Sequence, residues 1–194
     1  LLAGRAVQTR GQSPFLAESP SHAWMRELHG FAWLRHFRDA DVPMIRHHAR
    51  ALVAEWMATR EASRHPSARL PEVTARRMIA WLMNAPVLLT ETDHAFYQRF
   101  MRALARHAVI LDHIAGRRGL GLTRAYAAIA YAFYSLCALT GESEARRAAR
   151  LLAPALADTI LPDGCPIDRN PATALALVSL LLPLKSTYSA RGRT

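Results

Sequence analysis

The sequence contains almost no lysine, little cysteine and no clear strand pattern. Lys185 is the only lysine among the 25 basic residues, so arginine carries nearly all of the positive charge. The two cysteines, Cys137 and Cys165, do not form a Cys-x-x-Cys motif, which argues against a cysteine-based zinc site or a redox pair. No sustained apolar–polar alternation and no Asn-Gly turn occurs, so we do not expect β-strands.

The common catalytic motifs are absent as well. The sequence has no His-Glu-x-x-His zinc motif, no Gly-x-Ser-x-Gly nucleophile elbow, and no glycine-rich phosphate or dinucleotide loop. Nine histidines are present, but His94, His107 and His113 share one expected helix without matching carboxylates. We therefore expect neither a metal ion nor another cofactor.

The composition is that of a folded domain. The 194 residues are 51% hydrophobic and 21% charged, with a formal net charge of +10. The arginines are spread over the chain instead of forming a run, which argues against nucleic acid as the partner. A dispersed positive field favours an acidic ligand by long-range attraction. The chain starts at Leu1 and its last residues are polar, so we expect it to be a fragment of a longer protein.

Helical periodicity dominates after an irregular lead-in over residues 1–20. We expect seven helices, which pack as antiparallel hairpins because their connections are short. The fifth is apolar nearly all round but only about 16 residues long, below the roughly 20 needed to cross a bilayer, so we expect a buried helix and no transmembrane segment. The expected helices run from Ser21 to about Asp39, from Pro43, from Pro71 to a break or kink at Pro86, from Thr92 or Asp93 to about Ile114, from Thr123 to Gly141, from Ser143 to about Thr159, and from Asn170–Pro171 with an interruption at Pro183.

The first candidate site is the aromatic segment "AWMRELHGFAWLRHF" at residues 23–37. One helical face of it is expected to be core and carries Trp24, Leu28, Phe31 and Phe37. His29 and Trp33 lie off that face. An aromatic ring that stacks on a sugar, next to a polar group that binds hydroxyls, makes a carbohydrate platform.

The second candidate site is the loop "LPDGCPIDRNP" at residues 161–171. Asp163, Arg169 and Asn170 precede the last expected helix, and an arginine fork suits a carboxylate ligand. A purely structural alternative is that Asn170 caps the helix and its neighbours are exposed.

Several segments, in this order, resemble the heparinase II/III-like proteins of bacteria: "GQSPF", "AWMRELHGFAWLRHF", "TARRMIAWLMNAPVLL", "DHAFYQRFMRALARHAVIL" and "LPDGCPIDRNPATALALVSLLLPL". The resemblance implies an all-α, incomplete (α/α) toroid over residues 21–194. It also implies a C-terminal β-sandwich domain that this chain lacks, and a periplasmic or cytoplasmic location in a bacterium. Members with known activity are polysaccharide lyases, which cleave acidic glycans such as glycosaminoglycans or alginate by β-elimination.

The resemblance also suggests roles for individual residues. Arg169 or Asn170 would bind the uronate carboxylate, Trp33 would stack on the sugar, and His29 would be a polar contact or a base. Asp163 would belong to the same substrate-binding surface, and Asn170 is also a candidate catalytic residue. Tyr126 is a candidate acid, as are the nearby Tyr131 and Tyr134.

The loop follows the family pattern only in part. Asp163, Gly164, Arg169 and Pro171 match it, whereas Asn170 stands in place of a serine and Ala172 or Thr173 in place of the catalytic tyrosine. The alternatives are therefore a non-catalytic helical scaffold that binds glycan or protein and, on charge alone, a nucleic-acid binder.

Overall fold

The computed structural model describes residues 1–9, 11–18, 20–38, 43–59, 62, 64–138 and 141–192. Within these ranges the chain forms helices and no strand, apart from two isolated bridges at Leu2–Arg5 and Ile160–Pro166. The all-α prediction is confirmed. The chain divides into two compact units, Leu1–Arg106 and His107–Thr194, here called unit 1 and unit 2.

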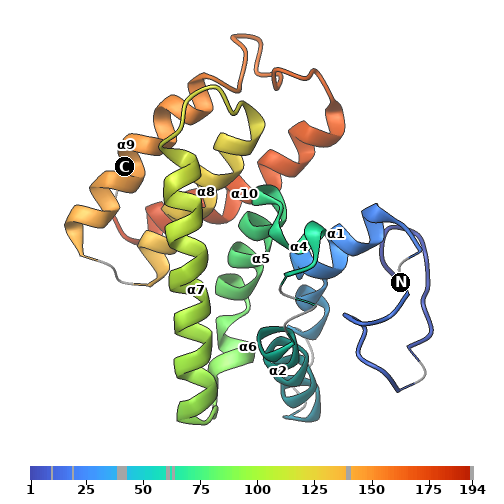
Figure 1. Cartoon of the computed structure of the whole chain (residues 1–194). Helices are drawn as coiled ribbons and strands as arrows, with labels where there is room; N and C mark the ends of the chain where they lie inside the picture. The colour runs from blue at the N-terminus through green and yellow to red at the C-terminus, as the bar shows by residue number, and fades with distance from the viewer. Residues whose placement is uncertain are drawn as a thin grey trace. The chain divides into compact units, whose positions relative to one another are not determined.

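Unit 1 holds the elements from the N-terminus to the first half of α7 (Figure 1). Its lead-in carries no described helix before His22. The short helix α4 lies between α2 and α5, at a place where none of the seven expected helices was located. The elements are α1 (His22–Gly30), the 3-10 helix η1 (Ala32–Phe37), α2 (Pro43–Ala58), α4 (Pro66–Arg69), α5 (Pro71–Met83), α6 (Ala85–Leu89) and α7 (His94–Ala115), which crosses the boundary between the units.

The prediction of one continuous first helix is wrong, because the structure breaks this helix in the middle. The Ser21 side chain caps α1 as predicted and accepts a hydrogen bond from the Trp24 N–H at 3.2 Å. At Phe31 the backbone turns left-handed, with φ +59°, and the chain continues as η1. The predicted end at about Asp39 lies outside the described residues.

An aromatic cluster forms the core of unit 1 and explains this break. Phe31 is fully buried, and its ring lies 5.4 Å from Trp81 and 5.8 Å from Trp56, edge to face in both cases. Trp81 in turn stacks on Phe100 of α7 at 5.4 Å. Edge-to-face aromatic packing adds stabilisation beyond the buried area, which compensates for the left-handed backbone. Trp24, with an exposed fraction of 4%, is buried as well.

Unit 2 is built around a buried, alanine-rich helix. Its helices are the second half of α7, α8 (Leu122–Cys137), α9 (Glu142–Ala157) and α10 (Pro171–Ala190). As predicted, α8 is buried on most sides, and it packs against both α9 and α10. Small side chains let the neighbouring helices approach closely.

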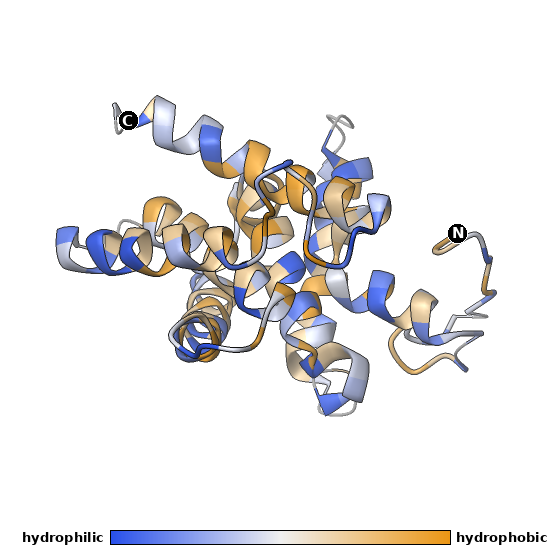
Figure 2. Ribbon diagram, turned by 90° about the horizontal axis from the view of Figure 1, so that it is seen from above, coloured by the Kyte–Doolittle hydropathy of each residue, from blue (hydrophilic) through white to orange (hydrophobic). Residues whose placement is uncertain are grey.

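The last helix differs from its prediction, because α10 continues through Pro183. It is also the one helix in the described residues that is long and apolar enough to cross a membrane by length and composition, and only 17% of its most apolar stretch is buried. Leu175, Val178 and Leu182 are exposed on it, and in Figure 2 its last turns, next to the C-terminus, are pale to blue while the part before them is orange. The length argument against a membrane span that applies to the fifth expected helix does not apply to α10, which has 20 residues.

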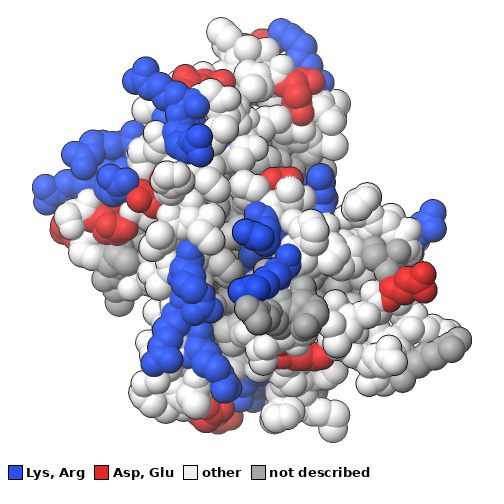
Figure 3. Space-filling model, in the orientation of Figure 1, with Lys and Arg blue, Asp and Glu red and all other residues white. Residues whose placement is uncertain are grey.

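Basic side chains are distributed over several elements. Figure 3 shows a row of them along the N-terminal half of α7, where Arg99, Arg102 and Arg106 are exposed at helical spacing. Acidic side chains are interspersed on the same face of the molecule.

Candidate functional site

The loop between α9 and α10 has a defined, folded-back backbone. Its two sides meet at the Ile160–Pro166 bridge, and the Leu161 N–H donates to the Cys165 carbonyl at 2.8 Å. Gly164 adopts φ +82° at the turn, a conformation that glycine reaches without steric cost. The loop is therefore held by its own backbone hydrogen bonds.

Asp163 connects the turn to Arg169. Its Oδ1 accepts a hydrogen bond from the Cys165 N–H at 3.0 Å, and its Oδ2 accepts one from Arg169 Nη1 at 3.2 Å. The Arg169 and Asp163 side chains are 67% and 49% exposed. An ion pair this exposed stabilises the fold by about 1 kcal/mol at most. Its main effect is to orient the guanidinium.

The backbone of Arg169 is left-handed, with φ +51°. Its N–H donates to the Pro166 carbonyl at 2.8 Å. The neighbouring Asp168 accepts from the Asn170 N–H at 3.1 Å and from the Thr173 hydroxyl at 2.7 Å. A left-handed residue other than glycine costs about 1–2 kcal/mol, and such strain is found preferentially at functional positions.

Asn170 caps α10. Its Oδ1 accepts a hydrogen bond from the Ala172 N–H at 2.9 Å, and Pro171 follows at the first helical position. The capping role that we considered for Asn170 is therefore present, and Asp168 and Arg169 are exposed beside it.

The candidate tyrosines lie in α8. Tyr126 is 7% exposed and Tyr131 is 1% exposed. The Tyr131 hydroxyl donates to Glu144 of α9, and burial together with this carboxylate raises the pKa of Tyr131. Burial also raises the pKa of Tyr134. The Tyr131 and Tyr134 hydroxyls are consequently protonated at neutral pH.

His29 is completely buried in unit 1. Trp56 Nε1 donates to its Nδ1 at 3.0 Å, and its ring stacks against His65 at 5.2 Å and Phe15 at 6.0 Å. Burial lowers the pKa of His29 to about 4, and the charges of His65 and Arg77 act in the same direction. The imidazole is neutral at pH 7 and has no surface at which a sugar could bind.

Trp33 is half-buried in η1. Its indole N–H donates to the Leu28 carbonyl at 3.0 Å. Its ring packs against Phe31 at 5.0 Å and Phe37 at 5.9 Å. Only the remaining part of the ring is available to a ligand.

The structure thus divides the candidate residues between the units. Asp163, Arg169 and Asn170 lie in one loop of unit 2, and Tyr126 lies in α8 of the same unit, whereas the segment with His29 and Trp33 belongs to unit 1. No group of three His, Cys, Asp or Glu side chains in the described part of the chain is placed to hold a metal ion.

One buried cation is not among the candidate residues found in the sequence. Arg77 is 2% exposed, and its Nη1 donates to the carbonyls of His29 and Ala68 at 3.0 and 3.1 Å. Its guanidinium lies 4.3 Å from the Trp56 ring centroid, a cation–π contact. The available signal was its position, because it lies four residues from both Val73 and Trp81 and so shares their buried face.

Comparison of the chain with family models, with curated proteins and with solved structures finds no match in any of the three. Function therefore has to be inferred from the sequence pattern and the geometry of the candidate residues.

Proposed function

We propose that this chain is the (α/α)-toroid domain of a heparinase II/III-like polysaccharide lyase that acts on uronate-containing glycans. In this proposal Arg169 binds the uronate carboxylate. The observation that carries it is the placement of Arg169, whose exposed guanidinium is oriented by Asp163 on a loop with a strained backbone.

The chemistry would be a β-elimination. Arg169 offers planar N–H donors that suit two-point binding of a carboxylate. Masking the carboxylate charge makes the adjacent C5 proton more acidic. A base takes this proton, the C4–O bond breaks, a C4–C5 double bond forms, and the leaving oxygen takes up a proton. We assign the base to the β-sandwich domain that the resemblance implies, because His29 and Tyr126 are buried.

The same burial supports a second candidate, a glycan-binding scaffold without turnover. In this alternative Arg169 still recognises an acidic sugar. The residues at the positions of the catalytic tyrosine, Ala172 or Thr173, cannot move a proton as a tyrosine does.

Two measurements on the same protein distinguish these functions. Equilibrium binding of uronate oligosaccharides tests recognition, and the ultraviolet absorbance of unsaturated uronate products tests the lyase reaction. Binding with product formation supports the lyase, whereas binding without product formation supports the scaffold.

The matched variants are Arg169→Ala and Arg150→Ala. Arg150 is an exposed arginine of α9, in the same unit, and controls for the general loss of one positive charge. We expect Arg169→Ala to weaken binding by about 1.5–3 kcal/mol, the range for a charged hydrogen bond, and Arg150→Ala to change it little. Equal effects of the two variants would exclude the loop as the carboxylate site.

A further inference from the structure

A basic pocket in unit 1 is not used by the proposed function. It has a volume of about 400 Å³ and lies between the first turns of α2 and the turn that joins α6 to α7. This volume is within the range of about 300–1,000 Å³ that is usual for small-molecule sites. Its lining residues are Pro43, Met44, Arg46, His47, Arg50, Thr90 and Glu91.

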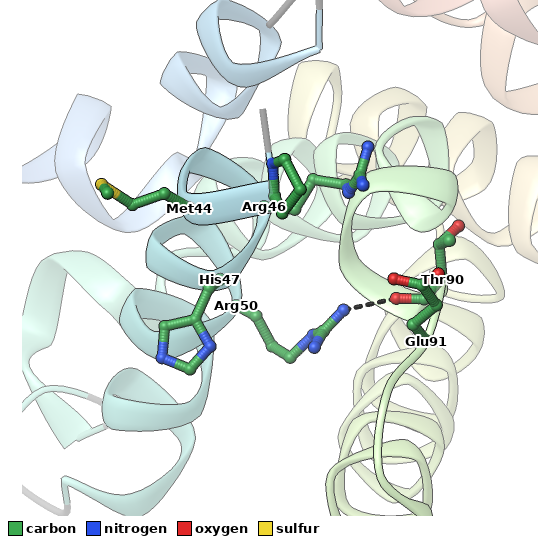
Figure 4. A pocket seen from close by; sticks show the side chains of 7 residues that line it. Met44, Arg46, His47, Arg50, Thr90 and Glu91 are labelled. Carbon is green, nitrogen blue, oxygen red and sulfur yellow. Dashed lines mark hydrogen bonds between the residues drawn. The ribbon is translucent and has the colours of Figure 1, made fainter. Parts of the chain in front are cut away.

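Arg50 is fixed in the pocket by two backbone carbonyls. Its Nε donates to the Leu88 carbonyl at 3.0 Å and its Nη2 donates to the Thr90 carbonyl at 2.5 Å. Figure 4 shows its side chain reaching from α2 toward Thr90. A guanidinium has five N–H donors, so these two bonds fix its plane and leave further donors for a ligand. An arginine already held in place loses little conformational entropy when it binds.

The described lining residues include two arginines and one acidic side chain, so together they carry a net positive charge. Arg46 extends from the same helix above Arg50, and His47 lies at the next position of α2 (Figure 4). The first turn of α2 contains no acidic residue, so the positive end of its helix dipole adds to the field of the arginines. Among the residues that the structure describes, Glu91 is the one acidic side chain that lines the pocket. It adopts φ +55°, a strained conformation of the kind found at ligand sites.

We propose that this pocket binds a small organic ligand through an oxyanion group, with Arg50 and Arg46 as the binding residues. A phosphate, sulfate or carboxylate group would accept hydrogen bonds from the two guanidinium groups. The carboxylate of Glu91 opposes the negative charge of the ligand and so limits its affinity.

Nuclear magnetic resonance titration of the full chain tests this proposal directly. The probes are inorganic phosphate and phenyl phosphate, which carry the same oxyanion with and without an organic group. We expect the backbone amide signals of residues 44–50 and 90–91 to shift, and phenyl phosphate to bind more tightly than phosphate. Signal shifts spread over other arginine-bearing surfaces would overturn the proposal. Equal affinities for phosphate and phenyl phosphate would show that the pocket does not recognise the organic part of a ligand.

Three variants and a control test the site. The two arginine variants should weaken ligand binding, whereas the glutamate variant should tighten it. Arg50→Lys keeps the charge but loses the planar fork, and Arg46→Gln removes a charge while leaving the Arg50 hydrogen bonds intact. We expect each to weaken phenyl phosphate binding by roughly tenfold, the effect of one charged hydrogen bond. Glu91→Gln should instead tighten binding several-fold. The control Arg69→Gln removes an exposed arginine of the same unit and should change nothing.

The combination of results separates a specific site from general charge. If Arg46→Gln and Arg69→Gln weaken binding equally, phenyl phosphate binds by net charge alone and the proposed site is wrong. If Glu91→Gln has no effect, the ligand does not bind beside Glu91, and the proposed site is wrong as well. Because Arg50→Lys also affects the turn at Thr90, its folding is checked by circular dichroism, and Arg46→Gln tests the site independently.

Discussion

Lowering the pH below neutrality should destabilise unit 1 through one buried imidazole. His29 is fully buried and accepts a hydrogen bond from Trp56. The positively charged guanidinium of Arg77 lies nearby and donates to the His29 carbonyl. Its pKa falls from 6.5 to about 4 because burial disfavours the charged form, and the charges of His65 and Arg77 add to this effect. Protonation of His29 therefore opposes folding.

The size of the effect follows from the two pKa values. Between pH 6.5 and 4 the unfolded chain binds a proton at His29 that the folded chain does not, so the free energy of unfolding falls as the pH falls across this window. Each pH unit costs about 1.4 kcal/mol, so the loss reaches about 3 kcal/mol near pH 4. Above pH 6.5 the imidazole is mostly neutral in both the folded and the unfolded chain, so its protonation no longer lowers the free energy of unfolding. A loss of this size is a large part of the roughly 5–15 kcal/mol that stabilises a typical domain.

Urea unfolding at a series of pH values, followed by tryptophan fluorescence, measures this loss. All four tryptophans of the chain lie in unit 1, so the signal reports on the unit that contains His29. The variant His29→Gln has no titrating group and should lose about 3 kcal/mol less than the wild type over the window. His22→Gln replaces an exposed histidine of the same helix and should behave as the wild type. If the wild type and His29→Gln lose equal stability, burial of a neutral imidazole is not the cause.

Three further variants test local features of the fold. Asn170→Ala removes the cap of α10 and should lower the stability of unit 2 by about 1 kcal/mol, measured by circular dichroism in urea. Arg77→Gln leaves buried carbonyls of unit 1 without their donor and should lower its stability by about 3 kcal/mol or more, measured by tryptophan fluorescence; a loss below about 1 kcal/mol would contradict the burial argument. Arg169→Gly relieves the left-handed backbone and should be more stable than Arg169→Ala, which loses the same Asp163 ion pair, by about 1 kcal/mol, while both weaken glycan binding; equal stability of the two variants in urea would show that Arg169 is not strained.

Helix starts were predictable because capping is local. Ser21, Asp93 and Asn170 each accept a hydrogen bond from a backbone N–H two or three residues later, as their sequence positions indicated. The hydrogen bond from the Phe96 N–H to the Asp93 carboxylate also lowers the pKa of Asp93. The prediction was wrong for Ser143, because α9 starts at Glu142 with Gly141 at its N-cap position.

The break at Phe31 was not predictable in this way. Nothing in the flanking residues requires a left-handed phenylalanine, and the turn is stabilised by contacts with Trp56 and Trp81, which are distant in sequence. The burial of His29 has the same origin, since Trp56 and His65 cover it from other elements. Periodicity within one helix indicates which face is apolar, but it does not show how far a neighbouring helix covers the residues beside that face.

The contact between Asp163 and Arg169 has a consequence for which anions can bind there. A carboxylate six residues away on the same loop is present at a high effective concentration and competes with any anion from solution. A single free carboxylate would compete poorly with the Asp163 carboxylate for Arg169. A polymer with a negative charge on each repeating unit would compete better, because the next group along the polymer rebinds as soon as one is displaced. If the loop binds glycans as proposed, it should therefore select long polyanions over acidic monomers.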